Sequence, residues 1–149
     1  MAPDAGQIRH WLGQTEARLG NRAAALNELQ TAERVSDTRN DSNPTIVVGL
    51  LYSYSRIDQS EDVARLFSEF EKAAADGVVG AGTWALAYLG LGDSDQALRW
   101  LRVAVEKIEN HEPDAGFLNL MSIKTNVQAN PVLDEPRFRE LRDRIGALD

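Results

Sequence analysis

Two helical patterns meet within residues 83–106, which read Thr83-Trp-Ala-Leu-Ala-Tyr-Leu-Gly-Leu-Gly-Asp-Ser-Asp-Gln-Ala-Leu-Arg-Trp-Leu-Arg-Val-Ala-Val-Glu106. On both sides of Gly92, apolar residues recur at offsets of three and four, the spacing of one side of a helix. Gly92 suits the left-handed residue that ends a helix, and Asp93 or Ser94 can cap the next one. The stretch therefore predicts two antiparallel helices joined by a tight turn.

The same unit recurs upstream. Successive offsets of five, four and three define it, and two sets share them: Gly92, Ala97, Leu101 and Ala104, and Gly20, Ala25, Leu29 and Ala32. A third set, Tyr54, Val63, Phe67 and Phe70, has the same spacing as Tyr88, Ala97, Leu101 and Ala104. In that set Asp58 replaces the turn glycine. A helix-turn-helix unit with a period of roughly 34 residues indicates a repeat architecture.

Over roughly residues 6–111 the chain resembles the tetratricopeptide repeat family. The matching residues are Leu12-Gly13, Leu50, Trp84, Tyr54, Tyr88, the turn glycines, and the pairs Ala25/Ala97 and Ala32/Ala104. The resemblance implies an all-α fold: a right-handed α-solenoid of about three helix pairs. We expect repeats at about 6–39, 44–77 and 78–111 and a C-terminal cap over 112–149, within a single domain of residues 1–149.

Helical spacing also predicts which side chains face inward. In the first pair we expect one apolar set of the first helix to pack on the second helix: Ile8, Trp11, Leu12 and Leu19. Pro113 is expected to begin a seventh helix. Asp134 can cap a final helix with Pro136 in its first turn and an apolar face made by Phe138, Leu141 and Ile145.

Composition narrows the classes of partner. The net charge is −7 and the pI is about 4.8, so the chain should repel nucleic acid and anionic membrane. No apolar run approaches the roughly 18 residues of a spanning helix, and no signal peptide is visible at the N-terminus. We therefore expect a cytoplasmic protein that binds neither nucleic acid nor membrane.

The sequence offers poor material for catalysis or metal binding. The chain has no cysteine, and its two histidines, His10 and His111, lie far apart. Gly77, Gly80 and Gly82 follow a helical pattern, whereas a phosphate-binding loop follows a strand. We expect no catalytic residue, no metal and no cofactor, and interpret the chain as a binding protein and not an enzyme.

A peptide-binding surface can be predicted from repeat geometry. In such a stack the first helix of each pair lines the concave groove, so its residues outside the packing positions point into that groove. The candidate peptide-binding residues are Gln14, Arg18, Val48, Tyr52, Ser55, Arg56, Leu86 and Lys124. This mixture suits a peptide with apolar side chains and some negative charge, and Tyr52 is the anchor expected by residue type.

An alternative function remains open. The segment Asn130-Pro-Val-Leu-Asp-Glu-Pro-Arg-Phe138 resembles the tail that follows such repeats in multidomain bacterial regulators and nucleotide cyclases. The likeness implies a regulatory, sensing or oligomerisation domain cut from a larger bacterial signalling or transcription regulator. Self-association as a homo-oligomer is a variant of the binding hypothesis, with Trp100 as one candidate contact.

Overall fold

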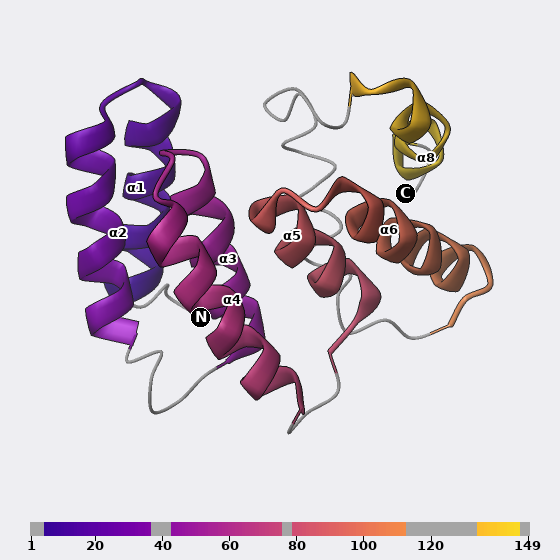
Figure 1. Cartoon of the computed structure of the whole chain (residues 1–149), viewed down its shortest axis with the longest axis horizontal. Helices are drawn as coiled ribbons and strands as arrows, with labels where there is room; N and C mark the ends of the chain where they lie inside the picture. Colours follow the sequence, from indigo (N-terminus) through magenta and orange to yellow (C-terminus); the bar gives the residue numbers. More distant parts are fainter. Residues whose placement is uncertain (1–4, 37–42, 76–78, 113–133, 147–149) are drawn as a thin grey trace. The chain divides into compact units, whose positions relative to one another are not determined.

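The computed structural model describes residues 5–36, 43–75, 79–112 and 134–146 (Figure 1). These residues form helices and no strand, so the expected all-α class is confirmed. The chain divides into two compact units, Met1–Gly77 and Val78–Asp149. The boundary coincides with the expected boundary between the second and third repeats.

The first unit contains two helix pairs. Helices α1 (Ala5–Arg18) and α2 (Arg22–Ser36) form the first pair, and α3 (Pro44–Ser55) and α4 (Ser60–Ala75) form the second. Helix α3 also contacts both α1 and α2, so the two pairs lie side by side (Figure 1). The aligned residues Ala25, Leu29 and Ala32 are at most 1% exposed, which confirms them as core.

The orientation of α1 differs from expectation. Ile8, Trp11, Leu12 and Leu19 were expected to face α2, but they are 44%, 51%, 44% and 68% exposed. Helix α1 instead buries Gly6 and Gly13. A Cβ on Gly13 would lie 2.8 Å from Cγ of Leu29, so the missing side chain lets Leu29 pack directly on the α1 backbone. The glycine side of α1, and not its apolar side, therefore faces α2.

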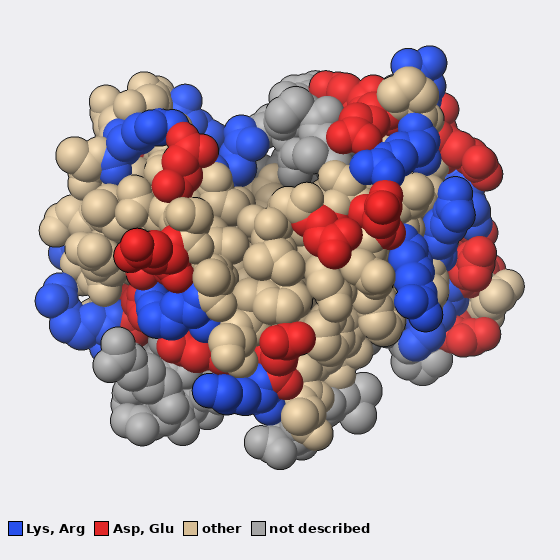
Figure 2. Space-filling model, in the orientation of Figure 1, with Lys and Arg blue, Asp and Glu red and all other residues tan. Residues whose placement is uncertain are grey.

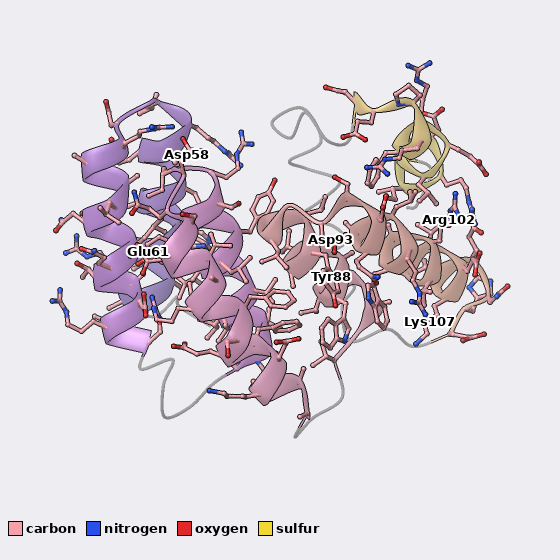
Figure 3. The ribbon with its side chains drawn as sticks, in the orientation of Figure 1. Asp58, Glu61, Tyr88, Asp93, Arg102 and Lys107 are labelled. Atoms are coloured by element: carbon pink, nitrogen blue, oxygen red, sulfur yellow. The ribbon has the colours of Figure 1, made fainter. Side chains whose placement is uncertain are left out.

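The three aligned turn positions share one backbone conformation. Gly20, Asp58 and Gly92 have φ angles of 80°, 57° and 85°, all in the left-handed region. Glycine enters this region without a steric penalty, and Asp is one of the few other residues that tolerate it. Asp58 also forms an exposed ion pair with Arg22 (Figure 3). The replacement of glycine by Asp58 thus preserves the left-handed backbone at this turn.

The second unit contains α5 (Ala81–Leu91), α6 (Ser94–Glu109) and α8 (Pro136–Gly146). The predicted turn between α5 and α6 is confirmed, because the Asp93 side chain accepts a hydrogen bond from the Gln96 amide at 3.1 Å. Tyr88 on α5 and Asp93 at the start of α6 are marked in Figure 3. The aligned residues Ala97, Leu101 and Ala104 are 0% exposed.

Helix α8 packs on α6 as a terminal helix. Phe138, Leu141 and Ile145 are all buried, as predicted, and α6 contacts α8. Arg144 on α8 donates to Glu109 on α6 at 2.6 Å, and this interaction holds the pKa of the Glu109 carboxyl below its usual value. The helix expected to begin at Pro113 lies outside the described residues.

Candidate peptide-binding surface

The α1 and α3 helices of the first unit meet through a small polar cluster. His10 Nε2 lies 2.8 Å from Ser53 Oγ and 3.1 Å from the Gly49 carbonyl oxygen. Gln14 Nε2 donates to Ser53 Oγ at 3.2 Å, and Ser53 Oγ donates to the Gly49 carbonyl at 2.9 Å. Two side chains one turn apart on α1 are thereby fixed to two residues one turn apart on α3.

Gly49 makes this approach possible. A Cβ at this position would lie 2.9 Å from Cε1 of His10, closer than real Cβ contacts. Any side chain here would push the imidazole away from α3 and break its hydrogen bonds. Glycine is therefore needed at position 49 because it leaves room for the His10 ring, and not because of its backbone angles.

The protonation of His10 follows from its surroundings. The Gly49 carbonyl can only accept a hydrogen bond, so Nε2 of His10 carries the proton in the tautomer that binds it, whereas Gln14 Nε2, 3.2 Å from the same ring nitrogen, can only donate to the other tautomer. Burial lowers the pKa of His10 below its usual value, and the hydrogen bond to the Gly49 carbonyl opposes part of that shift. Near neutral pH the ring is therefore an uncharged hydrogen-bonding group.

The predicted binding residues do not all reach a surface. Arg18 and Arg56 are exposed, and they occupy aligned positions at the C-terminal ends of α1 and α3. Tyr52 is half-buried, as is Ser55, whose hydroxyl donates to the Tyr52 carbonyl at 2.6 Å. These four, with Gln14, are candidates that a peptide could touch.

Two other predicted residues are buried. Val48 is 0% exposed and Leu86 is 5% exposed. Such side chains contribute to packing, so we do not include them among the direct contacts. Lys124 lies outside the described residues.

Sequence reasoning missed the pairing of His10 with Ser53 and Gly49. The residues are 39 to 43 positions apart, and their contact depends on how α1 and α3 align side by side. A usable signal was present: His10 and Gln14 are four residues apart, as are Gly49 and Ser53, and each pair therefore lies on one side of its helix. Recognising the cluster would have required matching these two faces.

A second polar network joins α2, α3 and α4 of the first unit. Arg65 on α4 contacts Glu33 on α2 at 2.7 Å, Asp62 at 2.9 Å and Glu69 at 3.1 Å. The Tyr54 hydroxyl donates to Glu33 at 3.1 Å, and burial together with that carboxylate raises the pKa of Tyr54. These contacts tie α3 and α4 to α2, which indicates a structural role, although Oε2 of Glu69 is buried without a hydrogen-bond partner.

Surface charge is mixed on the face drawn in Figure 2. Acidic and basic side chains alternate over α2 and α4, without a broad patch of one sign. Among the described residues, no group of His, Asp or Glu side chains is arranged to hold a metal ion. None of the described helices has the length and apolar character required to cross a membrane.

Comparisons with known proteins give no family assignment: the chain matches no protein-family model, no curated protein and no solved structure.

Proposed function

We propose that the chain is a non-catalytic protein-interaction module whose helix pairs belong to a right-handed solenoid of tetratricopeptide-like repeats. The support is internal to the chain. The three left-handed turns fall at aligned positions, and the aligned small and apolar residues of the first and third pairs are buried. A repeat of this kind offers its first helices as a binding surface.

We propose that a partner peptide lies along α1 and α3 of the first unit. One observation carries this proposal: the cluster of His10, Gln14 and Ser53 fixes the two helices to each other, and exposed Arg18 and Arg56 stand at their ends. A rigid surface loses little conformational freedom on binding. The two cations favour a peptide that carries carboxylates, with Tyr52 as an aromatic contact.

A peptide-display selection tests this function. Wild-type protein should enrich peptides containing Asp or Glu, and the affinity of one enriched peptide is then measured by fluorescence anisotropy. Arg56→Glu should weaken binding about tenfold or more, because one attractive charge becomes repulsive. Tyr52→Ala should also weaken it.

The matched controls are Arg34→Glu on α2 and Arg102→Glu on α6, both of which reverse an exposed charge elsewhere (Arg102 is marked in Figure 3). Both should bind like the wild type. Unchanged affinity of the Tyr52→Ala/Arg56→Glu double variant, or failure to enrich any peptide, would reject this binding surface.

An oligomerisation domain is the second candidate function. The exposed apolar side of α1 favours it.

A further inference from the structure

Helix α1 exposes a continuous apolar face. Ile8, Trp11 and Leu12 on α1, and Leu19 directly after its last residue, are each at least 44% exposed, and their spacing places them on one side of the helix axis. Single exposed apolar residues are ordinary, whereas a contiguous row on one helix marks an interaction surface. The other sides of α1 are occupied by contacts with α2 and α3.

The row has the spacing of a coiled-coil seam. Intervals of three and four residues alternate through Ala5, Ile8, Leu12, Thr15 and Leu19. These are a and d positions of two heptads. The same assignment places Arg9 and Glu16 along one edge of the seam and Trp11 and Arg18 along the other.

We propose that this face binds the α1 helix of a second copy of the chain, in an antiparallel, twofold-symmetric pair. In an antiparallel seam the a positions of one helix oppose the d positions of the other. Ile8 then opposes Leu19 of the second copy, and Leu12 opposes Thr15, twice each. Ile8 and Leu19 thereby each gain an apolar neighbour. The proposed dimer shares Arg18 with the peptide-binding surface of α1 and α3 but does not require a peptide to bind.

Charge complementarity selects the antiparallel orientation. Like edges meet across an antiparallel seam, so Arg9 faces Glu16 of the second copy and Trp11 faces Arg18. The first contact pairs opposite charges, and the second can place a guanidinium over an indole ring. In a parallel seam unlike edges meet, which would set Glu16 against Trp11 with no electrostatic gain.

Both Arg9 and Glu16 retain hydrogen-bonding groups that their contacts within the chain do not use. Arg9 is 47% exposed and contacts Glu28 through Nη1 alone, at 2.8 Å, so its remaining N–H groups can reach another carboxylate. Glu16 Oε2 accepts from Asn21 at 2.7 Å. The charged residues of α1 are two arginines and one glutamate. The chain's net charge of −7 is therefore not concentrated at this interface.

The size of the seam predicts a weak complex. A stable interface buries about 800 Å² on each partner, and two heptads of one helix supply less. Helix α1 is already held by α2 and α3, however, so dimerisation does not have to form the helix. We expect a dissociation constant on the order of 10–100 μM, and hence a concentration-dependent dimer.

Sedimentation velocity over a range of about 5 to 500 μM tests the dimer. Wild-type protein should shift from monomer to dimer across this range. Leu12→Glu should remain monomeric, because it places two like charges near the twofold axis. Leu91→Glu is the control, since Leu91 is 40% exposed at the end of α5, and it should dimerise like the wild type. A wild type that stays monomeric, or a Leu12→Glu variant that still dimerises, would overturn the proposal.

Cysteine crosslinking tests the orientation of the two α1 helices. Because the sequence contains no cysteine, each introduced cysteine is the only thiol in its variant. Ile8→Cys and Leu19→Cys proteins should form a disulfide only when mixed. Each alone should not, because eleven residues of helix separate equivalent positions by roughly 16 Å along the axis. Disulfides between identical variants, or none in the mixture, would overturn the antiparallel pair.

Discussion

The first and third helix pairs follow the same sequence pattern but present different outer faces. In both, the aligned Leu29 and Leu101 are fully buried between the two helices of the pair. The apolar residues of α1 outside that pattern remain exposed. In α5, Trp84, which aligns with Leu12, stacks on Trp100 of α6 with ring centroids 5.5 Å apart.

The inner sides of the two first helices differ as well. Helix α1 carries His10 and Gln14, whereas the aligned positions of α5 are Gly82 and Leu86. The shared sequence pattern therefore determines how the two helices of a pair pack together. Residues between the pattern positions determine what each pair can bind.

The largest expected effect comes from truncating the two aligned leucines, Leu29 and Leu101. Leu29→Ala and Leu101→Ala should each lower the free energy of unfolding by about 3 kcal/mol, because each leaves a cavity in a closed core. Urea unfolding measures the loss, and amide hydrogen exchange identifies the unit that opens. The aligned, half-buried Leu26 and Leu98 provide matched Ala controls, which should cost less. A cost below about 1 kcal/mol for either buried leucine would contradict the shared core.

The next largest effect is expected at the position where α1 crosses α2. Position 13 is Gly and the aligned position 85 is Ala. Gly13→Ala should cost about 1 kcal/mol, because crowding against Leu29 outweighs the gain in helix propensity. In the Leu29→Ala background the same change should stabilise the protein, since the new methyl group meets a cavity. Equal effects in both backgrounds would show that Gly13 does not pack on Leu29.

Substitutions at the turn residues Gly92 and Asp58 should change the free energy of unfolding by smaller amounts and in opposite directions. Gly92→Ala should lower the free energy of unfolding by about 1 kcal/mol, since alanine is strained at a φ of 85°. Asp58→Gly should raise it by at most about 0.5–1 kcal/mol, because the exposed ion pair with Arg22 contributes little. Thermal unfolding followed by circular dichroism distinguishes them. A stabilising Gly92→Ala would contradict the left-handed turn.

The sequence predicted the packing within each helix pair better than the contacts that each pair makes with the rest of the molecule. The turn at Gly92 and the buried set around Leu29 depend on residues close in sequence, where helical spacing is informative. The apolar stripe of α1 was correctly placed on one side of the helix but wrongly assigned to the α2 contact. Periodicity shows that a face is apolar, and it does not show what covers that face. The absent side chain of Gly13 was the deciding feature.

The candidate site was predicted less completely for the same reason. Gln14 and Tyr52 were chosen by their helix positions, which are local information. The contact of His10 with Ser53 requires two helices to align across 43 residues of sequence. Val48 was chosen as a groove residue but is buried, because burial depends on all neighbouring elements.

The smallest expected effect concerns His10, the polar residue that α5 lacks. The folded protein favours the neutral ring, so its pKa lies below the ordinary value of 6.5. As the pH falls below that value, the unfolded chain binds a proton that the folded chain resists. The contribution of the neutral His10 ring to the free energy of unfolding is therefore complete above about pH 6.5. It declines as the pH falls toward the folded-state pKa of His10.

Removing the imidazole should weaken this dependence. The decrease in melting temperature between pH 7.5 and 5.5, measured by circular dichroism, should be smaller in His10→Gln than in the wild type. His111→Gln removes the other histidine, which is exposed beyond α6, and serves as the control. An equal decrease in wild type and His10→Gln would mean that the imidazole is as well solvated in the folded chain as in the unfolded one. The polar inner side of α1 would then be a hydrated surface and not a fixed cluster, and the first pair would differ from the third only in its exposed apolar face.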